Sequence, residues 1–259
     1  MAHAPAPIVT LTTDFGRQDF HLPRLKGALI AAAGWLNLVD LNHEIPPYDI
    51  VRAAFICNRV WPHFPEGSIH LLSVNDYYQA KSRYLAIAHE GHYFVGPDNG
   101  LFSLIFGQLP TETYVLDGIQ ADDNLPTVYA RAIAHIAAGK PFYEVGLPST
   151  KFTDRLAFQP VIGTDYIRGT VTFIDRFENV TTNITRERFE AVGQGRPFEL
   201  LVKRMPSLKE LSRKYHDVEP GESLCRFSSD GLLEIAINTG RAASLLSIQE
   251  EDMVQVQFL

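Results

Sequence analysis

Cysteine is scarce in this sequence, because the 259 residues contain only Cys57 and Cys225. Cys57 follows the apolar residues 53–56, and a buried free thiol is the usual state in such a stretch. So few cysteines exclude the disulfide framework of small secreted domains. The first seven residues lack the charged and then apolar pattern of a secretory signal, and no apolar run approaches the roughly 18 residues of a membrane span. We therefore predict a cytoplasmic protein with no membrane partner.

An excess of basic charge is also lacking. The net charge is −7, and lysine and arginine form no cluster along the chain. The field around such a molecule repels polyanions, so we expect no nucleic-acid partner. Hydrophobic residues make up 46% of the chain, which is enough for a sizeable core. A soluble globular protein with a small-molecule ligand is the expected class.

Several common nucleotide and metal motifs are missing. The chain has neither a Gly-x-x-x-x-Gly-Lys loop nor a Gly-x-Gly-x-x-Gly turn. The triplet at residues 14–16 spells Asp-Phe-Gly, but the catalytic His-Arg-Asp of kinases does not accompany it. His89 and His92 stand three residues apart without a third ligand nearby, and we interpret residues 89–92 as a hairpin tip. We expect no metal and no cofactor.

The first half of the chain alternates short apolar runs with helical patterns. This alternation predicts an α/β domain with a mostly parallel sheet that is covered on both faces. The predicted strands are residues 7–12, 38–41, 68–74, 84–89 and 113–116, and the predicted helices are 22–33, 48–61 and 127–138.

From about residue 166 the pattern changes to strands without helices. Regular short strands separated by turn residues predict a smaller all-β barrel or sandwich. The predicted strands are residues 166–175, 179–184, 198–203, 223–227, 232–238 and 253–258. The stretch at 160–163 is the expected boundary, which gives an α/β domain at 1–160 and a β-barrel domain at 161–259.

Five motifs along the chain carry the functional information. The first, Thr12-Thr13-Asp14-Phe15-Gly16, follows the first strand, at the edge where open α/β sheets collect ligands. A simple turn explains these five residues equally well. The others are residues 43–49, 94–102, 173–179 and 229–238, and the motifs at 43–49 and 94–102 are also compatible with plain loop punctuation.

Taken together and in this order, the motifs resemble those of the S-adenosylmethionine hydroxide adenosyltransferases and their fluorinase and chlorinase relatives. The resemblance runs from about residue 8 to residue 257. It implies that S-adenosylmethionine is the substrate and that water, hydroxide or halide displaces methionine from the ribose C5′ without a metal. It also implies a homotrimer in which the first domain of one chain and the second domain of the next share a binding site.

The resemblance implies roles for particular residues. Asp14 would accept the ribose hydroxyls, and Tyr48 would line the pocket. In the second domain, the implied substrate-binding residues are Asp175, Phe177, Asn179, Ser229, Glu234 and Thr239. We expect residues 175, 177 and 179 to share one face of a strand, although Phe177 as a core residue and Asn179 as a turn residue remain an alternative. Glu178 stands where the family has glycine.

The chain departs from the hydrolytic members at the residues that would handle the nucleophile. Asp76 and Arg83 keep the seven-residue interval of the family's catalytic Asp and Arg, and we predict that both are catalytic, with Arg83 holding Asp76 ionised. In an ungapped alignment Asn75 takes the place of that Asp, and Asp76 then points to solvent.

In an ungapped alignment with the family, the catalytic histidine is missing and Asn124 lies in the segment that would contain it. His135 is then a helix residue with a structural role. A gapped alignment puts Tyr129 at the position of the catalytic histidine instead. Tyr77 and Tyr78 either close the nucleophile pocket or are exposed loop residues. Three functions therefore stay open: a hydrolase, a catalytically silent adenosyl-binding trimer, and a halide-dependent adenosyltransferase.

Overall fold

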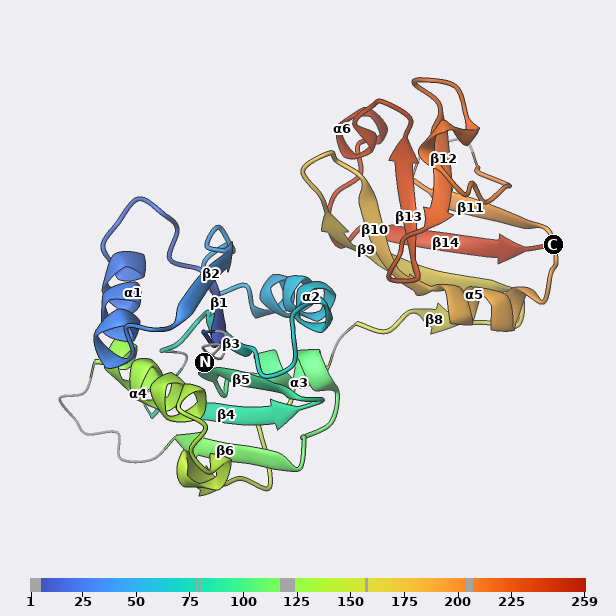
Figure 1. Ribbon diagram of the computed structural model, residues 1–259. Helices are drawn as coiled ribbons and strands as arrows, with labels where there is room; N and C mark the ends of the chain where they lie inside the picture. Colours follow the sequence, from blue (N-terminus) through green and yellow to red (C-terminus); the bar gives the residue numbers. More distant parts are fainter. Residues whose placement is uncertain (1–5, 78, 80, 117–123, 157, 204–206) are drawn as a thin grey trace, which may run out of the picture. The chain divides into compact units, whose positions relative to one another are not determined.

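The computed structural model describes residues 6–77, 79, 81–116, 124–156, 158–203 and 207–259, and Tyr78 lies outside these residues. The chain divides into two compact units, Met1–Ala157 and Phe158–Leu259. Figure 1 shows a sheet flanked by helices in the first unit and a sheet built from the chain's last strands in the second.

The first unit is built on a seven-stranded sheet in the order β2-β1-β3-β5-β4-β6-β7. Strands β2, β1, β3 and β5 are parallel to one another, whereas β4 and β7 run antiparallel to their neighbours. The sheet is therefore mixed and mostly parallel, as predicted. Its strands are β1 (Ile8–Thr13), β2 (Asn37–Asn42), β3 (Ile69–Ser73), β4 (Tyr84–His89), β5 (His92–Pro97), β6 (Glu112–Leu116) and β7 (Gly146–Pro148).

The antiparallel element in the middle of this sheet is the β4–β5 hairpin. Glu90 and Gly91 form its two-residue turn, and both have positive φ (47° and 77°), as a type I′ turn requires. The hairpin at residues 89–92 is thus confirmed. Strand β5 itself was missing from the predicted strands.

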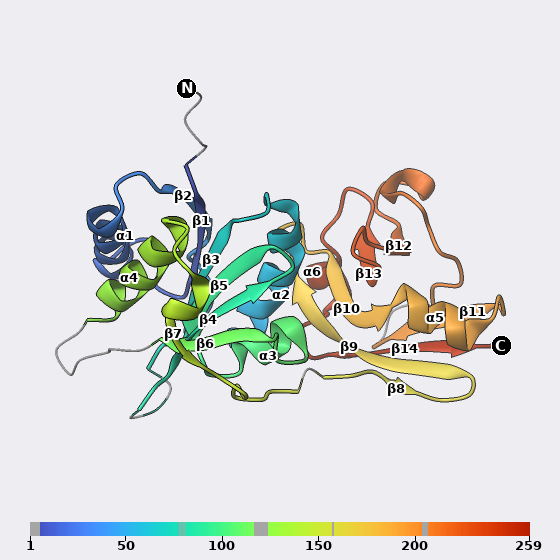
Figure 2. The ribbon, with the colours of Figure 1, turned by 60° about the horizontal axis from the view of Figure 1, so that its bottom comes forward.

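Helices cover both faces of the sheet (Figures 1 and 2). Helices α1 (His21–Ala32) and α4 (Leu125–Ala137) pack together on one face, while α2 (Ile50–Val60) and α3 (Leu101–Phe106) pack on the other. Neighbouring residues of β3 enter the two different cores, with Leu71 under α1 and α4 and Leu72 under α2 and α3. Burial on both faces explains why these strands are continuous apolar runs. Short 3₁₀ turns at Trp61–His63 and Phe142–Glu144 complete the unit.

The second unit is an antiparallel sheet in the order β11-β14-β9-β10-β13-β12, with β8 added beside β9. Its strands are β8 (Val161–Ile162), β9 (Tyr166–Ile174), β10 (Val180–Thr185), β11 (Phe198–Val202), β12 (Ser223–Phe227), β13 (Leu232–Ile237) and β14 (Met253–Phe258). The antiparallel strands agree with the predicted β-rich second domain. Its closure into a barrel or sandwich stays a prediction.

Two helices and a 3₁₀ turn that the sequence pattern did not predict also belong to this unit: α5 (Arg186–Gly193), α6 (Ala242–Leu246) and Tyr215–Asp217. Helix α5 begins where the Thr185 side chain accepts a hydrogen bond from the amide of Arg188, a standard N-cap. It packs Phe189 edge-on against the rings of Phe198, Phe227 and Phe258. One buried aromatic ring thus anchors a helix too short and polar to be recognised by its periodicity.

Across the described ranges, no helix has both the length and the apolar character needed to cross a membrane.

Candidate functional site

A cavity of about 640 Å³ lies where the strand order of the first unit reverses. The chain proceeds from β1 to β2 on one side and then to β3 on the other, so the ends of β1 and β3 flank a topological switch point, the usual ligand site of open α/β sheets. The cavity is lined by Asp14, Phe15, Asp19, His21, Arg24, Pro47, Tyr48, Asn75, Asp76, Tyr77, Asn124, Leu125 and Pro126.

Asp14 joins two of the loops that form this cavity. Its Oδ2 accepts hydrogen bonds from the backbone N–H of Tyr48 (3.0 Å) and of Asn75 (3.1 Å). Both residues have a left-handed backbone, with φ of 71° and 52°, which is uncommon and strained for a bulky side chain such as tyrosine. Within the described residues, Oδ1 of Asp14 accepts no hydrogen bond and stays available to a ligand.

Asp76 is a buried carboxyl in the wall of the cavity, with only 6% of its surface exposed. Its Oδ2 accepts a hydrogen bond from Ser73 Oγ (2.5 Å), and its Oδ1 accepts one from the Tyr129 hydroxyl (2.6 Å). Burial raises the pKa of Asp76 to about 7; the two hydrogen bonds oppose this rise, and the charge of Asp14 adds to it. A carboxyl that titrates near neutral pH suits general-base chemistry.

The surroundings of Asp76 also show where its carboxyl is directed. The alternative in which Asp76 points to solvent is wrong, because its carboxyl is enclosed by Ser73 and Tyr129. Asn75 also lines the cavity, with its backbone N–H bound to Asp14.

Asn99 supports this loop, and sequence reasoning gave it no role. Its side-chain amide donates to the carbonyls of Val74 (2.9 Å) and Asn75 (3.0 Å), while its own Oδ1 accepts from the N–H of Leu101. It is 3% exposed. The signal was present in the motif at residues 94–102, where an amide side chain follows a buried strand, but its partners are 24 and 25 residues away.

Among the described residues, no three His, Cys, Asp or Glu side chains are grouped so that they would hold a metal ion.

In the second unit, Asp175, Phe177 and Asn179 lie in the turn between β9 and β10. The Asp175 Oδ1 accepts the N–H of Phe177 (2.8 Å) and of Asn179 (2.8 Å), and its Oδ2 accepts from the Asn179 side chain (3.1 Å). The prediction that they share one strand face is wrong, because β9 ends at Ile174 and these bonds close an Asx-type turn. Phe177 is 75% exposed, so it is not a core residue.

Two profiles of one family match these two units. The SAM hydroxide adenosyltransferase N-terminal domain matches residues 9–146, and the C-terminal domain of the same family matches residues 169–255. The chain belongs to the SAM hydroxide adenosyltransferase family. The resemblance seen in the five motifs is thereby confirmed.

Curated relatives and a solved structure show the same similarity along the chain. An (R)-S-adenosyl-L-methionine hydrolase of Thermus thermophilus is 31% identical over 93% of this chain and 96% of its own length. Another protein of that name from Salinispora tropica is 28% identical over 98% of both chains. The crystal structure of an uncharacterized conserved protein from Thermotoga maritima has a TM-score of 0.83 and 25% identity, and covers 96% of this chain and 99% of that one.

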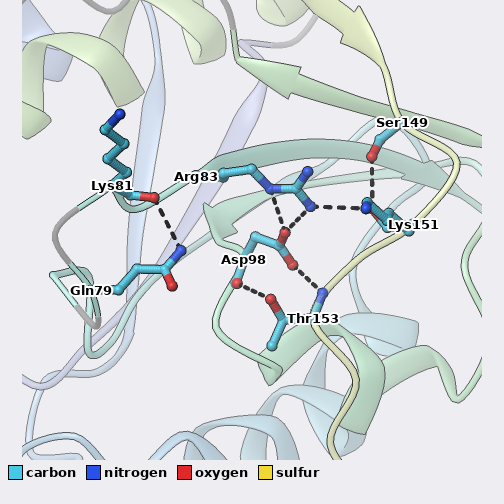
Figure 3. Close-up of polar contacts among 7 residues, drawn as sticks. All are labelled: Gln79, Lys81, Arg83, Asp98, Ser149, Lys151 and Thr153. Atoms are coloured by element: carbon cyan, nitrogen blue, oxygen red, sulfur yellow. Dashed lines mark hydrogen bonds and ion pairs between the residues drawn. The ribbon is translucent and has the colours of Figure 1, made fainter.

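Arg83, the other predicted catalytic residue, is engaged elsewhere in this family member (Figure 3). Its Nε and Nη2 both donate to Oδ2 of the buried Asp98, and Nη2 also donates to the carbonyl of Lys151. Oδ1 of Asp98 accepts the N–H of Thr153 (2.6 Å). The expectation that Arg83 holds Asp76 ionised is wrong, because Arg83 bonds Asp98 and burial raises the pKa of Asp76. A catalytic role for Arg83 stays a prediction.

The residues near the family's histidine segment fall at the start of α4. Asn124 is the N-cap of this helix, because its Oδ1 accepts the N–H of Thr127 (3.1 Å), and it also lines the cavity. His135 bonds the carbonyl of Pro141 (2.9 Å), which confirms its structural role. Tyr77 lines the cavity and is exposed, whereas Tyr129 contacts Asp76 from the buried face of α4.

The other three residues implied by the family lie along β13. Ser229 precedes the strand in an exposed turn, and Thr239 follows it with a φ of 54°. Glu234 is buried in the strand and accepts a hydrogen bond from the Tyr215 hydroxyl (2.9 Å), and burial raises its pKa. The turn at residues 175–179 adjoins the Thr239 end, because Glu178 bonds the amides of Ala243 and Ser244. The structure therefore groups this turn with Thr239 and leaves Ser229 at the far end of β13.

Glu178, at the family's glycine position, has a φ of 63°, a region that glycine enters without strain. Its carboxylate accepts the N–H of Ser244 (3.0 Å) in the first turn of α6. This side-chain contact explains how a non-glycine residue is accommodated there.

Proposed function

We propose that this protein hydrolyses S-adenosyl-L-methionine to adenosine and methionine by attack of water or hydroxide at C5′. The observation that carries the proposal is Asp76, a buried carboxyl with a pKa of about 7 in the wall of the switch-point cavity. A general base is most effective when its pKa is close to the working pH. The relatives named (R)-S-adenosyl-L-methionine hydrolase support the same substrate and its (R) epimer.

In this reaction the oxygen of a water molecule forms a bond to C5′ while the C5′–S bond breaks. The electron pair of the broken bond stays on sulfur, so the sulfonium becomes the neutral thioether of methionine. Asp76 takes the proton that the attacking water loses, and such assistance accelerates a reaction by about 10²–10⁴-fold. The negative charge of Asp14 at the same cavity favours a cationic sulfonium substrate.

We assign the ribose to Asp14 and one wall of the pocket to Tyr48. The available Oδ1 of Asp14 supports the first assignment, because a carboxylate can accept hydrogen bonds from two neighbouring hydroxyls. The exposed ring of Tyr48 at the cavity edge supports the second.

The second unit would supply contacts to methionine and adenine through Asp175, Phe177, Asn179, Ser229, Glu234 and Thr239. We propose that these residues meet Asp14 and Tyr48 in a homotrimer with sites shared between subunits. The exposed ring of Phe177, held out by an ordered turn, supports a role in contact with a ligand. Light scattering on the purified protein tests this, and a monomer that binds adenosine would contradict it.

We also propose that the enzyme acts in the cytoplasm and without a metal or cofactor. Dialysis against a chelator should leave its turnover unchanged, and cell fractionation should recover it with cytoplasmic enzymes. Loss of turnover that returns on adding one divalent metal would contradict the proposal that the enzyme needs no metal.

The deciding experiment incubates the protein with the (R) and (S) epimers of S-adenosylmethionine, each with and without chloride, and separates the products by chromatography. We expect adenosine and methionine from the (R) epimer, independent of chloride. The Asp76→Asn variant should bind adenosine like the parent and lose about 10²–10⁴-fold in turnover. Chlorinated adenosine would instead indicate a halide-dependent adenosyltransferase, and unchanged substrate with measurable binding would indicate a silent binding protein.

A further inference from the structure

Among the described residues of the first unit, the tyrosine that contacts Asp76 is the largest completely buried side chain. Tyr129 lies on α4 with no exposed surface, and its hydroxyl donates to Asp76 Oδ1 at 2.6 Å. The ring of Tyr84 packs edge-on against it, with ring centroids 5.6 Å apart and planes at 90°. This packing leaves the phenol little freedom to turn away from the carboxyl.

Ser73 completes the enclosure from the other side. It is the last residue of β3 and is 1% exposed, and its hydroxyl donates to Asp76 Oδ2 at 2.5 Å. One rigid strand and one rigid helix therefore each hold one oxygen of the same carboxyl. Sites that are built on such elements hold their geometry more precisely than sites on loops.

The chemical nature of these partners is informative. Among the described residues, no lysine, arginine or histidine bonds Asp76, and both donors are hydroxyls. A hydroxyl can accept a hydrogen bond as well as donate one, whereas a guanidinium or ammonium can only donate. The pair of hydroxyls can therefore accompany the carboxyl through both of its protonation states.

Resting on the proposed hydrolysis, we infer that Tyr129 and Ser73 are positioning residues that hold Asp76 as the base for the attacking water. Each hydroxyl donates to one oxygen of the ionised carboxylate, and the carboxyl itself lines the cavity. When Asp76 takes the proton of the water on a lone pair that neither hydroxyl occupies, both hydroxyls continue to donate to their oxygens. The proton from the water neutralises the carboxylate where it stands, so no ion has to leave the buried site during this step.

Other charged and titratable groups share the cavity with Asp76, and the variants compared below leave them unchanged. They are Asp14 and Tyr77, whose charges couple to Asp76, and His21 and Arg24 in the cavity lining.

The test compares Tyr129→Phe and Ser73→Ala with Tyr84→Phe. Tyr84→Phe is the matched control, because the Tyr84 hydroxyl donates to the backbone carbonyl of Asp76, at 3.4 Å, whereas Ser73 and Tyr129 donate to its carboxyl. In the first two variants we expect kcat to fall roughly 10- to 10²-fold with KM nearly unchanged, as for a misplaced catalytic group. Ser73→Thr, which keeps a hydroxyl, should restore most of the turnover.

The pH profile separates positioning from mere structural support. Donors to an ionised carboxylate lower its pKa, so their removal should move the acidic limb of the kcat profile to higher pH. Tyr84→Phe should leave this limb in place. An unmoved limb in both Tyr129→Phe and Ser73→Ala would overturn the inference, even if kcat falls.

A readout without turnover distinguishes this inference from the proposed function. Carbon NMR of labelled aspartate, assigned with Asp76→Asn, follows the Asp76 titration directly in the folded protein. If the parent does not hydrolyse S-adenosylmethionine, the proposed hydrolysis fails and with it the base role of Asp76. An upward shift of the titration in Ser73→Ala and Tyr129→Phe still supports the positioning, and an unchanged titration overturns it. Ser73→Ala removes one oxygen atom only, so the test does not depend on the folding of Tyr129→Phe.

Discussion

Asp76 and Asp98 both follow strands of one sheet and are both buried, with 6% and 1% of their surface exposed. Asp98 bonds the guanidinium of Arg83 and the amide of Thr153, an ion pair that ties the end of β5 to β4 and to the segment at residues 151–153. Asp76 bonds two hydroxyls and titrates near pH 7. Because both carboxyls are buried, what distinguishes them is the bonding partner, which is a guanidinium for Asp98 and a pair of hydroxyls for Asp76.

The largest expected effect that tests this comparison is the pH dependence of stability. The pKa of Asp76 is about 7 in the folded protein and 3.8 ordinarily, so the folded state binds this proton more tightly than the unfolded state. The contribution of Asp76 to stability is therefore present at acidic pH and is lost as the pH rises from about 4 through 7. Asp76→Asn removes this titration. The free energy of unfolding of the variant, relative to that of the parent, should therefore increase with rising pH, by at most on the order of 4 kcal/mol.

Urea unfolding of both proteins between these pH values measures the difference. The exposed Asp154→Asn serves as the control for the loss of one surface carboxylate. A difference for Asp76→Asn that is constant with pH would show that Asp76 is an ordinary carboxyl.

The next effect concerns Asp98. Asp98→Ala should lower the free energy of unfolding by about 3 kcal/mol, the lower end for a broken buried ion pair, because Arg83 is partly exposed and can be hydrated. A double-mutant cycle with Arg83→Met, followed by urea unfolding, isolates the energy of the pair itself. Additive losses in the double variant would refute the ion pair as the stabilising element.

The smallest expected effect belongs to Asp14. Asp14→Ala should weaken adenosine binding by roughly 1.5–3 kcal/mol, because a charged acceptor of the ribose hydroxyls is lost. It should also lower the pKa of Asp76, since the charge of Asp14 helps to raise it. Calorimetry with adenosine measures the first effect. Unchanged affinity in the folded variant would contradict the assignment of Asp14 to the ribose.

The Ala substitution also deprives the amides of Tyr48 and Asn75 of their acceptor. Asp14→Asn is the matched control, because its amide oxygen can keep these two bonds while the charge is removed. Binding that is weak in Asp14→Ala and intact in Asp14→Asn would assign the loss to the loops.

Sequence reasoning located the cavity loops but not the partner of Arg83. Asp14, Tyr48 and Asp76 follow strands that periodicity identified, and parallel strands end at one edge of their sheet. The Arg83–Asp98 pair depends on the register of the β4–β5 hairpin, in which Tyr84 faces Pro97. Strand β5 was missing from the predicted strands, and the seven-residue interval of the family's Asp and Arg paired Arg83 with Asp76 instead of Asp98.

The prediction of one strand face at residues 175, 177 and 179 was wrong for a different reason. Alternating residue types there are compatible with an extended strand, but Asp175 provides acceptors for the amides of Phe177 and Asn179. A side chain that bonds the nearby backbone competes with the hydrogen bonds between strands. A pattern of apolar and polar residues does not reveal this competition. The role of Tyr129 could not be decided from the sequence either, because its hydrogen bond to Asp76 joins residues that are 53 positions apart.

The double attachment at Asp14 Oδ2 has a consequence for how the site can change. Two loops that follow different strands are held by a single atom, at residues whose backbone is left-handed. A substitution at position 14 therefore also alters the two loops. If Asp14 binds the ribose as proposed, ligand preference and loop geometry cannot be varied one at a time there. Engineering a new sugar specificity would have to begin at Tyr48 and Asn75, where glycine relieves the left-handed strain, before the carboxylate itself is exchanged.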